Sequence, residues 1–73
     1  MSAKEMFKKL GYENDIKKEH TIGYIKNKKT ITFNNSGNYI YFVVMEEGRV
    51  NPTIDLEELQ AINEQVRELC WYE

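Results

Sequence analysis

Three β-rich segments joined by very short connections constrain this chain more than any other feature. They are 21–26 (TIGYIK), 30–34 (TITFN) and 38–45 (NYIYFVVM), and their β-branched and aromatic residues favour strands. Two or three residues join the first pair of segments, and 35–37 joins the second pair. Parallel strands need a crossover of about a dozen residues. The short connections therefore predict a three-stranded antiparallel meander.

Turn positions predict which side chains share a face of the sheet, because side chains alternate along a strand. A two-residue turn at 27–28 places Tyr24 opposite Ile31. A two-residue turn at 36–37 places Ile31 opposite Phe42. The predicted core face comprises Ile22, Tyr24, Ile31, Phe33, Ile40, Phe42 and Val44. The predicted open face comprises Thr21, Gly23, Ile25, Thr30, Thr32, Tyr39, Tyr41, Val43 and Met45.

A short helix is expected before the strands, at about residues 2–11. Ser2 suits the N-cap, and Glu5 stands three residues on, where it completes a capping box. Gly11 suits the left-handed position that ends a helix. The helix carries one apolar stripe, formed by Ala3, Met6, Phe7 and Leu10. Two isolated helical turns are unstable in water, so this stripe must pack against another element.

A longer amphipathic helix is expected at about residues 55–71, opened by a capping box of Asp55 and Glu58. Its apolar seam comprises Leu56, Leu59, Ile62, Val66, Leu69 and Cys70. The seam is roughly two heptads long, which is short for a coiled coil. The apolar face of the meander also has no other large cover. We therefore expect the seam to close the core, with Trp71 sealing its edge and Asn63 at its boundary.

These elements predict one domain over residues 1–73, of the α+β class. The expected architecture is a two-layer α-β-β-β-α fold in which both helices pack on one face of a three-stranded antiparallel sheet. Segments 13–19 and 46–53 are polar or contain glycine and proline, and they are predicted to be loops.

Composition places the chain in a reducing compartment. A single cysteine cannot form an intrachain disulfide. The N-terminal residues carry charges every few positions and lack the apolar stretch of a signal peptide. The longest apolar run, 39–45, is too short to span a bilayer. We expect a cytoplasmic protein without a membrane segment.

No arrangement of residues predicts catalysis. His20 is the only histidine and has no identifiable orienting partner, and Cys70 with His20 cannot supply the roughly four ligands of a structural zinc site. The acidic pairs at 46–47 and 57–58 are sequence neighbours whose side chains point apart, and the glycines form no phosphate loop. The sequence predicts no catalytic residue, no cofactor and no metal, and hence a protein that is not an enzyme.

A nucleic-acid contact is an alternative that depends on the lysines Lys26, Lys28 and Lys29 near one turn. Tyrosines on neighbouring strands could stack on bases. Against this, the net charge is −2, and residues 30–73 carry two arginines against eight acids. Residues 1–29 carry eight lysines against four acids, and a charge division of this kind also suits contact with a protein. Nucleic acid is the less favoured partner.

The stronger functional indication is segment 38–45, which is apolar on both faces and ends the meander. The expected interface residues on the open face are Ile25, Tyr39, Tyr41, Val43 and Met45. They would contact an unknown partner protein, or a second copy through 38–45; alternatively, the first helix or a loop covers them. A third hypothesis is an acidic inhibitor of another protein. It would use Glu57, Glu58, Glu64 and Glu68 on the outer side of the closing helix.

The two ends of the chain resemble a group of small uncharacterised proteins from phages and prophages of Gram-positive bacteria. Residues 2–13 (SAKEMFKKLGYE) match a start of the form A-x-x-M-F-x-x-L-G-Y, and 54–71 match an ending E-E-L-x-A-I-N-x-Q-x-x-E-L-G-W. Cys70 departs from that ending where the group has glycine, which lets the last helical turn continue. The resemblance spans nearly the whole chain. It implies a phage or mobile-element origin and no catalytic residues. The expected partner is then an unknown host or phage protein, and the target of an acidic inhibitor would be a host defence protein.

Overall fold

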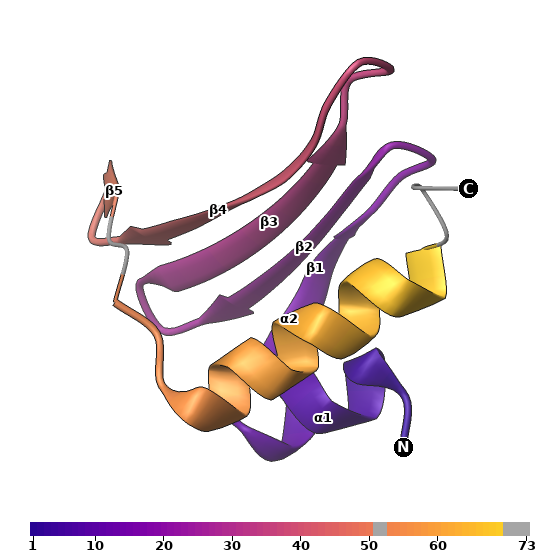
Figure 1. Cartoon of the computed structure of the whole chain (residues 1–73). Helices are drawn as coiled ribbons and strands as arrows, with labels where there is room; N and C mark the ends of the chain where they lie inside the picture. The colour runs from indigo at the N-terminus through magenta and orange to yellow at the C-terminus, as the bar shows by residue number, and fades with distance from the viewer. Residues whose placement is uncertain (51–52, 70–73) are drawn as a thin grey trace.

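The computed structural model describes residues 1–50 and 53–69, and it is an α+β fold with an antiparallel sheet on which two helices pack (Figure 1). Its elements in chain order are α1 (Ala3–Lys9), β1 (Glu13–Lys17), β2 (Thr21–Lys26), β3 (Lys29–Asn35), β4 (Ile40–Glu46), β5 (Arg49–Val50) and α2 (Leu56–Leu69). The predicted α+β class is confirmed. The predicted strand number is wrong, because the sheet has five strands in the order β1-β2-β3-β4-β5 rather than three.

Strand β1 was expected to be a loop because its sequence is polar. It pairs with β2, and Ile16 lies opposite Gly23 after a bulge. The Asn14 side chain donates hydrogen bonds to the carbonyls of Ile16 (3.0 Å) and Gly23 (2.7 Å), which stabilises the irregular pairing. An edge strand half-buries only alternate residues, here Asn14 and Ile16, so its composition carries little strand signal.

Strand β5 was also expected to be a loop. Glu47 and Gly48 both have positive φ, at 55° and 78°, which is the backbone conformation of a tight primed hairpin turn. This turn returns the chain for two residues beside the end of β4. Glycine is the residue that adopts positive φ most readily, so the turn signal was present, but the strand after it is too short for a pattern.

The first predicted turn is confirmed, and the second is displaced by one residue. Lys26 pairs with Lys29, so 27–28 form the turn between β2 and β3. The Ser36 amide donates to the Tyr39 carbonyl at 2.9 Å, so the second turn is 37–38 and not 36–37. Ile31 therefore lies opposite Val44 rather than Phe42, and Phe33 lies opposite Phe42 rather than Ile40. The displacement shifts each partner by two residues, which keeps every side chain on its predicted face.

The capping signals of α1 are confirmed. The Ser2 hydroxyl accepts a hydrogen bond from the Glu5 amide, and the Glu5 carboxylate accepts one from the Ser2 amide. Gly11, with φ of +95°, ends the helix, and the Tyr12 amide donates back to the Phe7 carbonyl at 2.9 Å. This return places the Tyr12 ring against the core.

The predicted phase of α2 is wrong at its N-terminal end. Leu56 and Leu59 are 68% and 40% exposed, whereas Glu58 and Gln65 are buried with Ala61 and Ile62. Asn63 is exposed, and the predicted roles of Cys70 and Trp71 lie outside the described residues. The buried polar positions have partners, since Glu58 accepts a hydrogen bond from the Tyr12 hydroxyl and Gln65 accepts one from the Tyr24 hydroxyl. These hydroxyls need acceptors in the core, and the helix supplies them.

Phe7 is the centre of the core between the helices and the sheet. Its ring stacks on Tyr24 with centroids 4.0 Å apart, and it makes edge contacts with Tyr12 at 5.6 Å and Phe33 at 6.2 Å. The buried cluster joins α1, α2, β2, β3 and β4 and comprises Phe7, Tyr12, Tyr24, Ile31, Phe33, Val44, Ala61 and Ile62. The helices thus cover one face of the sheet and leave the other without a helix (Figure 1).

Candidate interaction surface

The sheet has two edges, and the edge at β1 is protected. Charged residues at every second position, Glu13, Asp15 and Lys17, are exposed along it. The bulge between Glu13 and Ile16 also makes the strand irregular. Charges and bulges both hinder the addition of another strand to an edge. This side of the sheet is not suited to pair with another chain.

The edge at β4 has no such protection. β5 pairs with Met45 and Glu46 only. The Glu47 amide donates to the Lys28 carbonyl at 3.0 Å, so residue 47 bonds towards the β3 side. Because hydrogen-bonded positions alternate along an antiparallel strand, the backbone groups of residues 41, 43 and 45 also point towards β3. The N–H and C=O groups of Ile40, Phe42 and Val44 consequently face away from β3. No described strand pairs with Ile40 or Phe42 along that side, because β5 pairs only with Met45 and Glu46.

Apolar side chains gather at the same place. Among the described residues, five of the eight exposed large apolar side chains lie on β4, its turn or β5. They are Tyr39 at 71%, Ile40 at 38%, Tyr41 at 47%, Phe42 at 42% and Val50 at 73% exposed. Residues 39–44 together with Val50 are called the β4 edge below.

Ile40 and Phe42 were predicted to lie in the core, and the structure corrects this. Both side chains point to the face that the helices cover, as predicted. The helices lie under the side of the sheet nearer β1, however, and do not reach the first part of β4 (Figure 1). Only Val44, nearer the end of β4, is buried. The sequence signal that could have found this surface is the absence of any charge between Asn38 and Met45.

The five predicted interface residues are not one compact patch. Tyr41, Val43 and Met45 alternate along β4 on the face without helices, and Val43 and Met45 are half-buried. Ile25 lies two strands away, opposite Thr30, and is also half-buried. Tyr39 lies in the turn before β4. The structure therefore brings Tyr39 and Tyr41 to the edge and separates Ile25 from them.

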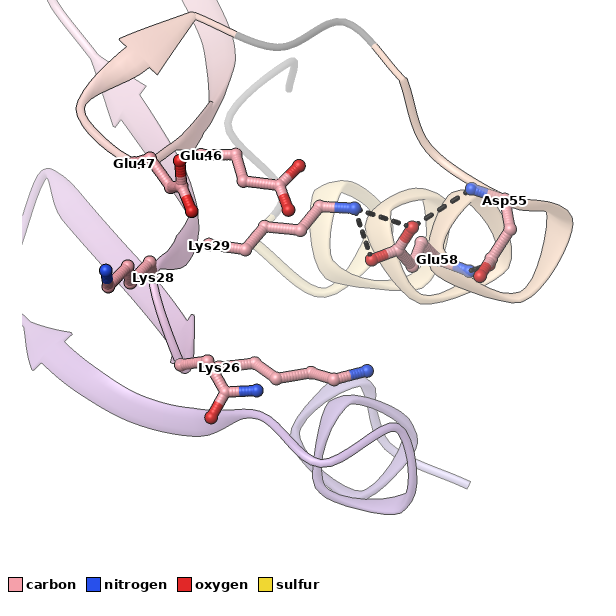
Figure 2. Close-up of a pocket in the computed structure, with 8 residues that line it drawn as sticks. Lys26, Lys28, Lys29, Glu46, Glu47, Asp55 and Glu58 are labelled. Atoms are coloured by element: carbon pink, nitrogen blue, oxygen red, sulfur yellow. Dashed lines mark hydrogen bonds and ion pairs between the residues drawn. The ribbon is translucent and has the colours of Figure 1, made fainter.

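The three lysines of the alternative nucleic-acid site lie among acidic side chains. They line an open cavity of about 460 Å³ together with Glu46, Glu47, Asp55 and Glu58. Figure 2 shows these side chains. Lys29 is turned inward, with its side chain 19% exposed and its ammonium 2.9 Å from a Glu58 oxygen. The Lys26 ammonium lies 5.5 Å from the Tyr12 ring centroid, at cation–π distance. Acidic groups thus offset the lysines locally.

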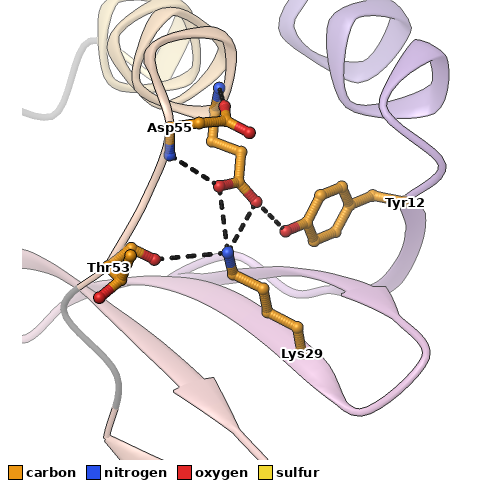
Figure 3. Close-up of polar contacts among 5 residues, drawn as sticks. Tyr12, Lys29, Thr53 and Asp55 are labelled. Atoms are coloured by element: carbon orange, nitrogen blue, oxygen red, sulfur yellow. Dashed lines mark hydrogen bonds and ion pairs between the residues drawn. The ribbon is translucent and has the colours of Figure 1, made fainter.

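Glu58 is the centre of a partly buried polar network. Figure 3 shows how Tyr12, Lys29, Thr53 and Asp55 are arranged in it. Its carboxylate accepts hydrogen bonds from the Tyr12 hydroxyl, the Asp55 amide at 3.0 Å and the Lys29 ammonium at 3.0 Å. The Glu58 amide donates to the Asp55 carboxylate at 2.8 Å, which completes the predicted capping box. Lys29 also donates to the Thr53 carbonyl at 3.4 Å. The network joins the start of α2 to α1 and to β3.

The titration of these groups favours a structural role. Burial raises the pKa of Tyr24 to about 12, and the charge of Glu68 adds to the rise. Burial, followed by the hydrogen bond to Glu58, raises the pKa of Tyr12. Both phenols stay protonated donors at neutral pH, so neither is an activated nucleophile or base. The buried side-chain polar atoms in the described part of the chain all have partners.

The stability of the protein should depend on the ionisation of Glu58. Burial acts to raise its pKa, but the hydrogen bonds from Tyr12, Asp55 and Lys29 outweigh burial and hold the pKa below its ordinary value of 4.5. A depressed pKa stabilises the fold above the unfolded value, and this contribution is lost as the pH falls through the folded value. We expect urea unfolding at constant ionic strength to show the free energy of unfolding declining below about pH 4.5 more steeply than in Glu58→Gln. Equal slopes would contradict this role.

The acidic side of α2 is also less available than predicted. Glu58 is buried, Glu64 pairs with Arg67, and Glu68 accepts a hydrogen bond from the Ala3 amide at 2.7 Å. Of the four predicted residues, Glu57 is the one that is exposed and makes none of these contacts.

The predicted absence of a histidine-based site concerns His20, which is exposed beside Glu19. Within residues 1–50 and 53–69, no group of three or more His, Cys, Asp or Glu side chains could hold a metal ion.

The fold and this edge define an α+β domain with one unprotected sheet edge. No protein-family model matches the chain, and neither curated proteins nor solved structures give a match to it. Neither helix in the described part of the chain is long and apolar enough to cross a lipid bilayer.

Proposed function

We propose that this chain is a small non-enzymatic protein that acts through protein contacts made by the β4 edge. One observation carries the proposal: the outward backbone groups of Ile40 and Phe42, which no described strand pairs, coincide with a cluster of exposed apolar side chains. An added strand would satisfy the backbone groups, and the side chains on both faces would give it affinity and specificity. The nucleic-acid hypothesis requires Lys29 and the acidic-inhibitor hypothesis requires Glu58. Both hypotheses lose support, because these two side chains form an ion pair with each other.

The resemblance of both chain ends to phage and prophage proteins supports a second part of the proposal. The protein is a phage-type accessory protein that works in the cytoplasm, and it requires no cofactor. Its partner is a protein of the phage, of the host, or a copy of itself.

The proposal is tested by selecting short displayed peptides on the immobilised chain and mapping the selected peptides by NMR. We expect extended apolar peptides that shift the amide signals of Ile40, Phe42 and Val44. Phe42→Asp should abolish the selection, because a carboxylate would be buried beside the added strand. Leu56→Asp is the matched control. It should select the same peptides as the wild type, because Leu56 is 68% exposed on α2, away from the β4 edge. Selection that survives Phe42→Asp, or shifts that map to another surface, would refute the proposal.

A further inference from the structure

We infer that the partner of the β4 edge is a second copy of this chain, paired antiparallel through β4 about a two-fold axis at Tyr41. The inference rests on the proposed function, because the dimer uses the same β4 edge. It adds the identity of the partner that binds there. A two-fold contact requires a surface that is complementary to itself. The β4 edge meets this requirement in its charge, its backbone groups and its length.

Charge permits self-pairing here. Residues 38–45 carry no charged side chain, so two copies of β4 can approach without like charges facing each other. The opposite edge, at β1, carries Glu13, Asp15 and Lys17 and a bulge. The chain therefore has one edge that excludes a further strand and one that accepts it.

β5 determines the register. It occupies the outer side of Met45 and Glu46, so a partner strand must stay opposite residues before Met45. With the axis at Phe42, Tyr39 of the second copy would face Met45, where Val50 already lies. With the axis at Tyr41, Tyr39 of the second copy faces Val43 and stays clear of β5. The latter register fits the available edge.

In this register, Ile40 of each copy pairs with Phe42 of the other. These residues carry the backbone groups that face away from β3, so each pair exchanges two hydrogen bonds. Their side chains, 38% and 42% exposed in one copy, meet on the helix side, where no described helix covers them. The sheet becomes continuous across both copies, with the helices of both on one side.

On the other side of the sheet, Tyr41 faces Tyr41 of the second copy. Residue 41 bonds towards β3, so it forms a non-hydrogen-bonded pair across the new contact, with Cα atoms about 4.5 Å apart. Tyr41 is 47% exposed in one copy, and facing rings at this distance bury each other. Tyr39, 71% exposed, packs beside Val43 of the second copy. The short contact predicts a weak dimer, in the micromolar range.

The axis at Tyr41 gives the inference a specific test by sedimentation velocity at concentrations up to about 1 mM. The wild-type chain should dimerise. Tyr41→Glu and Tyr41→Lys should each be monomeric, because like charges then face each other. An equal mixture of the two should recover the dimer, since the carboxylate then faces the ammonium. Leu56→Glu places the same charge on α2 and should dimerise as the wild type does.

A monomeric wild type, or a mixture no more dimeric than its components, overturns the inference. Circular dichroism establishes that each variant is folded. If the Tyr41 variants unfold, a mixture of Ile40→Lys with Phe42→Glu tests the same register, because these positions face each other. A monomeric wild type that still selects peptides at the β4 edge would refute the dimer and leave the proposed function standing. Loss of both would refute both.

Discussion

Replacing Phe7 by alanine should bring this protein close to unfolding. Phe7 is fully buried and contacts three aromatic rings, from Tyr12, Tyr24 and Phe33. Truncating a buried phenylalanine costs about 3–5 kcal/mol, through lost burial and the cavity left behind. A chain of this length has a free energy of unfolding of about 4–11 kcal/mol. Urea unfolding followed by circular dichroism measures the loss.

Phe42→Ala is the matched control, since it removes the same atoms from the face of the sheet against which Phe7 packs. Phe42 is 42% exposed and its ring centroid lies 6.0 Å from that of Phe33, so its loss should cost about 1–2 kcal/mol at protein concentrations below the dimerisation range. Equal costs for the two substitutions would show that α1 does not organise the core as the stacked rings indicate.

Glu58→Gln should have the second-largest effect, a loss of about 2–4 kcal/mol in the free energy of unfolding. The glutamine side chain has nearly the same shape but carries no charge. The Lys29 ammonium, only 19% exposed, then lacks a counter-ion. The hydrogen bonds from Tyr12 and from the Asp55 amide also lose a charged acceptor. Chemical unfolding at pH 7 measures the loss.

The coupling between Glu58 and Lys29 is measured by a double-mutant cycle. Lys29→Met keeps the apolar stem and removes the ammonium. The double variant should be more stable than the sum of the single losses predicts, by about 1 kcal/mol or more, because neither charge is then left unpaired. Additive losses would mean that the contact between the two groups does not contribute to stability.

Most of the sheet and both helix caps could be predicted from local chemistry. The turn at 27–28, the capping boxes of Ser2 with Glu5 and of Asp55 with Glu58, and the left-handed Gly11 at the end of α1 depend on a few adjacent residues. Alternation predicted the faces of β2, β3 and β4 even though the second turn was misplaced by one residue. A face changes only when the register shifts by an odd number.

The phase of α2 could not be predicted, because apolar spacing was the only guide. The apolar residues Leu56 and Leu59 continue the spacing of three and four residues, yet the helix exposes them and buries Glu58 and Gln65. Their partners are the hydroxyls of Tyr12 and Tyr24, which are distant in sequence. A buried hydroxyl requires an acceptor, and this requirement becomes visible only once the helices and strands are packed together.

By itself, the sequence determined the α+β class, the three hairpin-linked central strands and the uncharged character of 38–45, since all of these follow from short-range spacing and composition. The tertiary structure decided that β1 and β5 join the sheet, that Lys29 is buried against Glu58, and that Ile40 and Phe42 are left exposed at an open edge. The exposure of Ile40 and Phe42 depends on how far the two helices extend beneath the sheet. That reach is a property of the packed chain and not of any segment within it.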